Sequence, residues 1–184
     1  MNKIFFFLML CAACFMGCEK NDSSSAFGVP TIYMPQATVS GGSNANYPVP
    51  SGLDSATRNY VDDPKGGVLN VLLGVSRSGK VSNEAFAVNI KVNKDTINQL
   101  ITTGALDAST ILMPDDVYTL PSSVSVPAGS SSEYFSLLLD KGKLKTYAGS
   151  KLAIAVGLAN PTKYQLNPVL STTIVIINVN ALFL

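Results

Sequence analysis

The amino-acid sequence predicts an all-β protein, an antiparallel β-sandwich of about seven to eight strands with one short helix. Apolar runs recur through residues 31–184, and turn residues such as Gly, Pro, Asn and Asp separate them about every ten positions. The run over 85–93 alternates apolar and polar side chains, which is typical of a strand buried on one face. The hydrophobic fraction of 47% and the charged fraction of 14% suit one folded domain and exclude a disordered protein of the acidic or basic tail type.

The predicted strands follow one another along the chain. Within 85–93, every second residue from Phe86 to Val92 is apolar, so these side chains share the buried face. Pro35 has no N–H to donate, which places the first strand at a sheet edge or at a bulge. The predicted strands cover residues 31–37, 68–77, 85–93, 117–120, 123–127, 132–139, 152–158 and 172–179.

One helix and one long loop complete the predicted fold. Asp95 can cap a helix that Gly104 ends, and the apolar residues between them have helical spacing. A helix of about two turns cannot stand alone, so we expect it to cover one end of the sandwich. Residues 41–67 are rich in Gly, Pro, Asn and Asp, and they predict a long surface loop with little regular structure.

The first 17 residues predict an export signal. Lys3 supplies a basic start, and the uncharged stretch that follows has about fourteen residues, fewer than the roughly twenty of a membrane-spanning helix. The stretch ends at Gly17 and Cys18, and no A-x-A cleavage site precedes the polar residues beyond them. This pattern resembles a bacterial lipoprotein signal, in which the peptide is cut before the cysteine that carries the lipid. Cys14 is a second candidate, and an ordinary cleaved signal or an uncleaved anchor is a third.

The chain therefore divides into three predicted segments. Residues 1–17 form the lipoprotein signal peptide, residues 18–30 form the lipidated Cys18 with a flexible Ser-rich tether, and residues 31–184 form the β-sandwich domain. Several acyl chains would hold the protein firmly on a membrane, because each buried CH₂ contributes about 0.8 kcal/mol. Without Lys3 the processed chain is neutral, so charge adds little to the anchor and gives no reason to bind nucleic acid.

The composition excludes several kinds of active site. The sequence has no His, which is the commonest general base and metal ligand, and its three Cys all lie within the first 18 residues. We therefore expect no disulfide, no metal site, no cofactor and no enzyme activity in the sandwich domain. The acidic doublets Asp62–Asp63 and Asp115–Asp116 stand beside prolines and favour turn caps over calcium binding or glycoside hydrolysis.

One short motif resembles a phosphate-binding loop. Residues 74–80 match the pattern G-x-x-x-x-G-K, but Val81 stands where Ser or Thr would hold magnesium, and a strand follows in place of a helix. The motif therefore favours a hairpin. Ser78 and Lys80 could share one strand face as a catalytic Ser–Lys pair, although exposed turn residues are the favoured interpretation.

Two tyrosines suggest a surface that contacts a glycan. Trp is absent, but Tyr47 and Tyr60 lie in the polar loop over 41–67, where an exposed aromatic face could stack on a sugar ring. The nearby polar residues of this candidate site are Asn44, Asn46, Arg58 and Asn59. The alternative is that both rings pack onto the sandwich and fix the loop. The other five tyrosines lie in or near predicted strands, and we expect them in the core or at its rim.

Several short segments together resemble a known family. They are residues 32–37, 73–79, 118–121, 124–129 and 164–168, in this order behind a lipoprotein-like signal. The arrangement is similar to a domain-of-unknown-function family of Bacteroidales surface lipoproteins. That family forms the N-terminal module of glycan-binding lipoproteins and of some family-18-type endoglycosidases, and the resemblance extends over about residues 31–178.

The resemblance implies an immunoglobulin-like β-sandwich, anchoring in the outer membrane and a setting in polysaccharide capture. It supplies no catalytic residues, because enzyme activity in this family belongs to a C-terminal partner domain that this chain lacks. We therefore expect a non-catalytic, cell-surface lipoprotein, an accessory or binding module in glycan capture. Its expected partners are the membrane, through the lipid anchor, and a polysaccharide or a surface protein complex. The alternative is a structural adhesin or pilus-like subunit that assembles through an edge strand.

Overall fold

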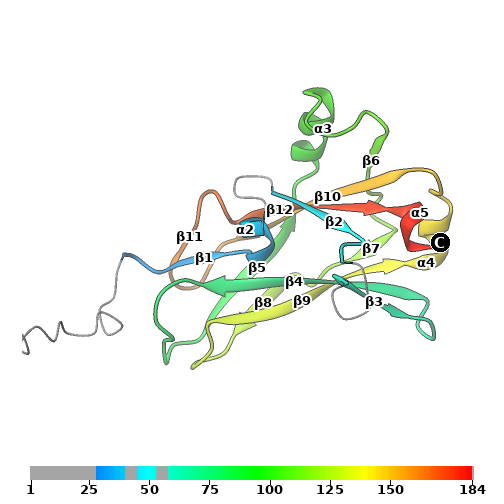
Figure 1. Ribbon diagram of the computed structural model, residues 1–184. Coiled ribbons are helices and arrows are strands. Elements are labelled where there is room, and N and C mark those ends of the chain that lie inside the picture. Colours follow the sequence, from blue (N-terminus) through cyan, green and yellow to red (C-terminus); the bar gives the residue numbers. More distant parts are fainter. Residues whose placement is uncertain (1–27, 40–44, 53–57, 184) are drawn as a thin grey trace, which may run out of the picture.

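Two β-sheets packed face to face form the protein in the computed structural model, which describes residues 28–39, 45–52 and 58–183 (Figure 1). The first sheet contains β11 (Gln165–Leu166), β1 (Thr31–Tyr33), β4 (Val68–Arg77), β9 (Ser132–Asp140) and β7 (Tyr118–Thr119) in this order, and β3 (Tyr60–Asp63) also pairs with β4. The second contains β2 (Ala45–Val49), β12 (Thr172–Asn178), β10 (Lys151–Ala159), β5 (Phe86–Val92) and β8 (Ser123–Val126), and β6 (Thr110–Leu112) pairs with β10. This arrangement confirms the predicted all-β sandwich.

The described residues contain more strands than the sequence predicts, and the sheets are mixed. Most pairs are antiparallel, but β1–β11, β10–β6 and β12–β2 are parallel. The additional strands are short and come from segments whose turn-like composition hides them: β2, β3, β6 and β11. The same described residues form four short helices, α2 (Pro35–Val39), α3 (Lys94–Thr102), α4 (Lys141–Lys145) and α5 (Val179–Leu182), and α5 follows the last strand. None of the described helices is long and apolar enough to cross a bilayer.

The main core lies between the two sheets, and β10 is buried on both of its faces. Leu152, Ile154 and Val156 face the first sheet. Ala153 and Ala155 point to the opposite face, where they pack with α3 in a second, smaller cluster. Because alanine is small, the sheet surface at these positions leaves room for the helix to approach.

Helix α3 confirms the one predicted helix, but its N-cap residue and its position on the sandwich differ from the prediction. The N-cap is Asn93, whose side chain accepts from the N–H of Thr96 at 3.3 Å, and not Asp95. The chain leaves the helix through Gly104, at a φ of +73° that favours glycine. Ile97 is fully buried against the outer face of the second sheet, so α3 covers that face and not one end of the sandwich.

The prediction of a long irregular loop over 41–67 was wrong in part. Residues Ala45–Val49 form β2, which pairs in parallel with β12, and Tyr60–Asp63 form β3, which pairs with β4. Both strands lie at sheet edges, where few backbone hydrogen bonds are needed and where prolines such as Pro48 are tolerated.

The first predicted strand is also shorter than expected. It ends at Tyr33, because Pro35 begins α2, and proline suits the first turn of a helix. The side chain of Gln36 then reaches the edge of β4 between the stretches that pair with β1 and β3. Its Oε1 accepts from the N–H of Gly74 at 3.2 Å, and its Nε2 lies 3.5 Å from the carbonyl of Leu72. The glutamine thus satisfies backbone groups that no strand covers.

Candidate functional site

The structure brings four of the predicted glycan contacts together at one edge of the sandwich. Asn59 joins the segment before β3 to the end of β2: its Nδ2 donates to the carbonyl of Pro48 and its Oδ1 accepts from the N–H of Ser51, both at 2.8 Å. These bonds hold Tyr47, Arg58, Asn59 and Tyr60 in one neighbourhood. The Asn59 side chain thus adds to the backbone bond from its own N–H to the carbonyl of Ser51, and together they join the two segments of the cluster.

The two rings of this cluster are half-buried and pack against the main core. Burial raises the pKa of Tyr47 above its usual value, and a hydrogen bond with the Asn59 side chain offsets part of that rise. The exposed Arg58 places its Cζ 5.9 Å from the centre of the Tyr60 ring. Each ring thus offers only part of its surface to a ligand, and the role of these tyrosines in glycan contact stays a prediction.

The remaining predicted contacts lie elsewhere. Asn46 precedes Tyr47 on β2, so its side chain points to the opposite face of the second sheet. Asn44 and the lipidation candidate Cys18 are outside the described residues.

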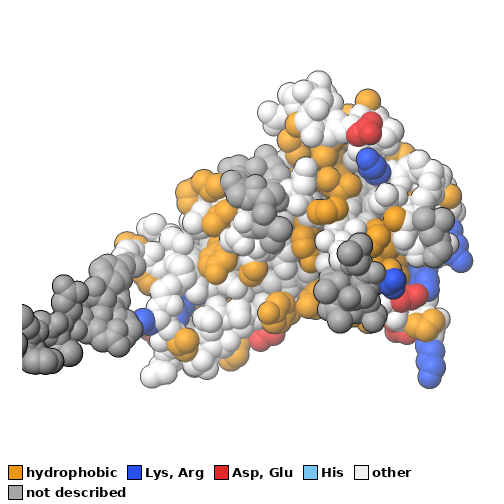
Figure 2. Space-filling view, viewed as in Figure 1, with side chains coloured by type: hydrophobic (Ala, Val, Ile, Leu, Met, Phe, Trp, Pro, Cys, Tyr) orange, Lys and Arg blue, Asp and Glu red, His pale blue; other side chains and the backbone are white. Residues whose placement is uncertain are grey.

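On that opposite face, a cavity of about 460 Å³ lies between β2, the ends of β10 and β12, and the segment that joins α3 to β6. We call it the α3 cavity. Leu106 and Ile176 give it an apolar floor, and Asn46, Asp107, Lys151 and Asn178 supply its polar groups. Figure 2 shows apolar side chains gathered below α3, with acidic and basic side chains close to each other at their margin. Concave sites with a few polar groups around apolar lining are typical of small-ligand binding.

The polar groups of the α3 cavity are held by local contacts. The carboxylate of Asp107 accepts from the N–H of Ser109 at 2.9 Å, and this bond is the main cause that lowers the pKa of Asp107. Lys151 lies 3.9 Å from the same carboxylate, a long ion pair between half-exposed side chains. Asn178 caps α5 through its Oδ1, which fixes the position of its amide. The cavity thus combines amides, a carboxylate and an ammonium group.

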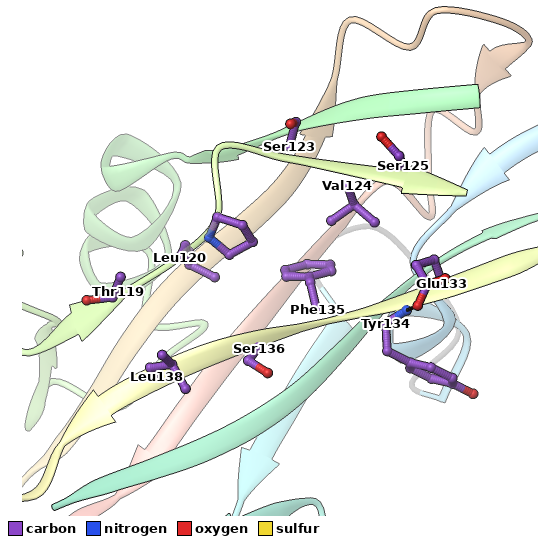
Figure 3. A pocket seen from close by; sticks show the side chains of 11 residues that line it. Thr119, Leu120, Ser123, Val124, Ser125, Glu133, Tyr134, Phe135, Ser136 and Leu138 are labelled. Atoms are coloured by element: carbon purple, nitrogen blue, oxygen red, sulfur yellow. Dashed lines mark hydrogen bonds between the residues drawn. The ribbon is translucent and has the colours of Figure 1, made fainter. Parts of the chain in front are cut away.

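A second surface carries an exposed aromatic ring. Tyr134 on β9 is 61% exposed and stands opposite Gly74 on β4. A Cβ on residue 74 would lie 3.5 Å from the Cδ1 of this ring, an ordinary van der Waals contact, so the ring packs over Gly74 on the outer face of the first sheet. Figure 3 shows the Tyr134 side chain pointing away from Phe135 and Val124. The ring is therefore exposed, not part of the core.

Sequence reasoning missed most of these residues for a clear reason. Asp107, Lys151 and Asn178 come from three distant segments, and nothing in the local sequence relates them. Tyr134 could have been found, because the period-two pattern of β9 places it with Ser136 and Leu138 on the face opposite to the buried Phe135.

The acidic doublets stand in turns or at a strand end, and each carboxylate has a structural partner. Asp63 accepts from the N–H groups of Lys65 and Gly66, which closes a turn. The other three acidic residues pair with lysines: Asp62 with Lys141 at 2.7 Å, Asp115 with Lys94 at 2.6 Å and Asp116 with Lys143 at 3.4 Å. Within the described residues, no group of three or more acidic, His or Cys side chains could hold a metal ion.

The segment that matches a phosphate-binding pattern connects the two sheets. It runs from β4 of the first sheet to β5 of the second, so the hairpin prediction for residues 74–80 was wrong. Gly79 adopts a φ of +81° in this connection, and a strand, not a helix, follows it. A phosphate-binding loop needs the N-terminus of a helix at this place, which the segment lacks.

Comparison with protein families identifies the family of the domain. A family model described as an N-terminal domain matches residues 31–165, which is most of the chain. This match confirms the resemblance to a family of N-terminal modules. No protein with a curated description matches the chain.

Solved structures from Bacteroides share the fold. A candidate carbohydrate-binding protein from Bacteroides ovatus is 10% identical at a TM-score of 0.54, and the match covers 80% of this chain and 36% of that one. A Bacteroides ovatus protein of unknown function is 20% identical at a TM-score of 0.52, over 80% of this chain and 45% of that one. A two-domain protein of unknown function from Bacteroides fragilis is 13% identical at a TM-score of 0.50, over 82% and 45%. The chain thus spans less than half the length of these proteins.

Proposed function

Because the chain belongs to this family of N-terminal domains, we propose that it is a non-catalytic, lipid-anchored module of the outer membrane that binds surface glycans. One protein with the same fold is described as a candidate carbohydrate-binding protein, which supports this class of ligand. The signal-like segment that ends at Cys18 supports the lipid anchor.

The composition of the α3 cavity carries the proposal. A sugar ring has apolar C–H faces and a rim of hydroxyl groups. The apolar floor of Leu106 and Ile176 suits the C–H faces, and the amides of Asn46 and Asn178 can bond to the hydroxyl groups. The carboxylate of Asp107 and the ammonium of Lys151 can form charge-assisted hydrogen bonds with further hydroxyls.

The same cavity argues for binding over hydrolysis. Glycoside hydrolases use a pair of carboxyl groups about 5–10 Å apart on either side of the scissile bond. Asp107 is the one carboxylate that lines the cavity in the described residues. Its lowered pKa keeps it ionised, whereas a general acid needs a raised pKa.

The test is a glycan array probed with the purified chain, followed by titration calorimetry with the glycan that is retained. Asp107→Asn keeps an oxygen for the N–H of Ser109 but removes the charge, and we expect it to weaken binding about tenfold or more. Asp115→Asn is the matched control, because Asp115 is also an exposed, lysine-paired carboxylate but lies outside the cavity. Equal affinity of Asp107→Asn and wild type would remove the α3 cavity from the proposal.

Two further variants separate the competing surfaces. Loss of binding only in a Tyr47→Ala, Tyr60→Ala double variant would assign the glycan to the predicted tyrosine cluster. Loss in Tyr134→Ala that Tyr134→Phe restores would assign it to the outer face of the first sheet. Release of reducing ends from the retained glycan by the pure chain would contradict the non-catalytic part of the proposal.

The anchor has its own test. Cells that express the wild-type chain should incorporate a labelled fatty acid into it, and Cys18→Ala should abolish the label. Cys14→Ala is the matched control and should leave the label unchanged. A label that depends on Cys14 would move the processing site.

A further inference from the structure

The two sheets leave an open groove at the sandwich edge formed by β8 and β9. The groove has a volume of about 500 Å³, and we call it the β8–β9 groove. Figure 3 shows Leu120, Val124 and Phe135 pointing into the space between the strands. Val124 and Phe135 are buried in the main core, so the floor of the groove is apolar and continuous with the core.

Along a strand, the backbone groups of successive residues point alternately to the two neighbouring strands, and this alternation shows which groups of β9 face the groove. Arg77 donates its N–H to the carbonyl of Ser131, so the odd-numbered residues of β9 bond to β4. The even-numbered residues point the other way, as Asp140 shows by donating its N–H to the carbonyl of Val117 beside β7. The backbone groups of Tyr134 and Ser136 therefore face the groove.

The open stretch of β9 is sharply bounded. If the pairing of β7 with β9 continued, Pro121 would stand opposite Ser136. Proline has no N–H to donate, and the pairing of the two strands ends before this position. At the other end, the Oγ of Ser130 bonds to both backbone groups of Ser132, and the carboxylate of Glu133 accepts from the N–H of Tyr134 at 3.1 Å. Among the described residues, the N–H and carbonyl of Ser136 and the carbonyl of Tyr134 have no strand partner.

The opposite wall of the groove is the outer edge of β8, the last strand of the second sheet within the part of the chain that the structure describes. Ile90 donates its N–H to the carbonyl of Ser122, so the even-numbered residues of β8 bond to β5. The backbone groups of Ser123 and Ser125 then point away from β5, and no charged side chain lies on this strand. Natural edge strands are usually protected by charges or prolines, and here the prolines stand only at the flanks, at 121 and 127.

We propose that the β8–β9 groove binds an extended peptide segment of a partner protein, which adds to β9 as a further strand. Only an extended backbone offers donors and acceptors at the two-residue spacing that Tyr134 and Ser136 present. The peptide side chain opposite Phe135 enters the groove, so the partner carries an apolar residue there and small or polar residues on either side. This surface is distinct from the α3 cavity, which lies on the outer face of the second sheet.

The test uses the full chain and an acetylated peptide of alternating threonine and valine with a lysine at each end. We expect millimolar or tighter binding, and slower amide hydrogen exchange at Ser136 when the peptide is present. The amide of Ser132, which already has a partner, should not change. The matched probes are two forms of the peptide that are N-methylated at alternate residues, so that each lacks the N–H donors along one of its two edges. The form that lacks the donors facing β9 should bind about tenfold more weakly or worse.

A protein variant gives an independent readout. Ser136→Pro removes the N–H that faces the groove and costs no bond to β4, so it should weaken peptide binding about tenfold. Glycan binding by the same variant should be unchanged, which separates this proposal from the one above. The proposal is overturned if both methylated peptides bind as well as the parent, or if Ser136 is not protected. It is also overturned if Ser136 is protected without peptide because two copies of the chain pair there.

Discussion

The guanidinium of Arg77 lies over the ring of Tyr164, with 5.0 Å between its Cζ and the ring centre. Arg77 is only 5% exposed, and it also donates to the carbonyl of Lys80. The ring of Tyr164 in turn meets the ring of Phe86 edge-on, at 5.6 Å between centres. These contacts join the end of β4 to the start of β5 and to the segment before β11.

Arg77→Ala should lower the free energy of unfolding by about 2–3 kcal/mol, because it removes a desolvated cation–π contact and the packing of the side-chain stem. Chemical denaturation measures this change. Arg58→Ala is the matched control: its guanidinium is exposed and lies 5.9 Å from the Tyr60 ring. That control should change stability by less than about 0.5 kcal/mol. Equal effects of the two variants would contradict a special role for the Arg77–Tyr164 pair.

Neighbouring leucines on β4 test the register of the first sheet. Leu73 is fully buried between the sheets, whereas Leu72 is 44% exposed on the outer face. Leu73→Ala should cost about 3 kcal/mol of stability, and Leu72→Ala less than about 1 kcal/mol. Thermal unfolding of both variants measures the difference. The reverse order would mean that the strand is shifted by one residue, since such a shift exchanges its two faces.

Stability should fall on acidification through the ion pair of Glu84. A hydrogen bond from Lys163, at 3.0 Å, is the main cause that lowers the pKa of Glu84 below its usual value of 4.5. A lowered pKa in the folded state gives stability that is present above the usual pKa and is lost as the pH falls through the folded pKa. Lys163→Met should therefore raise the pKa of Glu84 in an NMR titration. A Glu84 carboxyl that titrates at 4.5 or above in the wild type would refute this account.

Asn59 should control both the pKa of Tyr47 and the edge of the sandwich. Burial raises the pKa of the Tyr47 hydroxyl, and the Asn59 side chain lowers it. Asn59→Ala should therefore raise that pKa further, and it should cost about 1–2 kcal/mol because two hydrogen bonds to the backbone are lost. Ultraviolet titration measures the pKa, and Tyr47→Phe identifies the signal. An unchanged pKa in Asn59→Ala would show that the two side chains are not coupled.

The long strands and α3 could be predicted from sequence because their signals are local. The alternation from Phe86 to Val92 gives β5 directly, and the burial of Phe86, Val88 and Ile90 confirms it. The short edge strands could not be found in this way. Residues 45–49 place Ala45, Tyr47 and Val49 at alternate positions, but Pro48 and the neighbouring Gly and Asn residues hide this short pattern, and they form β2 by pairing with the edge of β12.

The candidate binding surfaces depend more on tertiary structure. The tyrosine cluster was selected from residues close together in sequence, and the structure keeps Tyr47 and Tyr60 half-buried against the core. The α3 cavity joins Asn46 to Asp107 and Lys151, which are far apart in sequence. No local pattern relates such residues, because their proximity arises from the order of the strands.

The sequence by itself determined the layered β architecture, the family of the domain and the absence of histidine chemistry, since composition and period-two alternation depend only on neighbouring residues. Tertiary structure alone decided which cavities and strand edges the protein presents. Strand order placed small alanines beneath α3 and exposed Tyr134 opposite Gly74, and among the described residues it left the outer edge of β8 and the stretch of β9 beyond its pairing with β7 without a strand partner. The physical reason is that hydrogen-bond pairing and close packing act between segments that are distant along the chain.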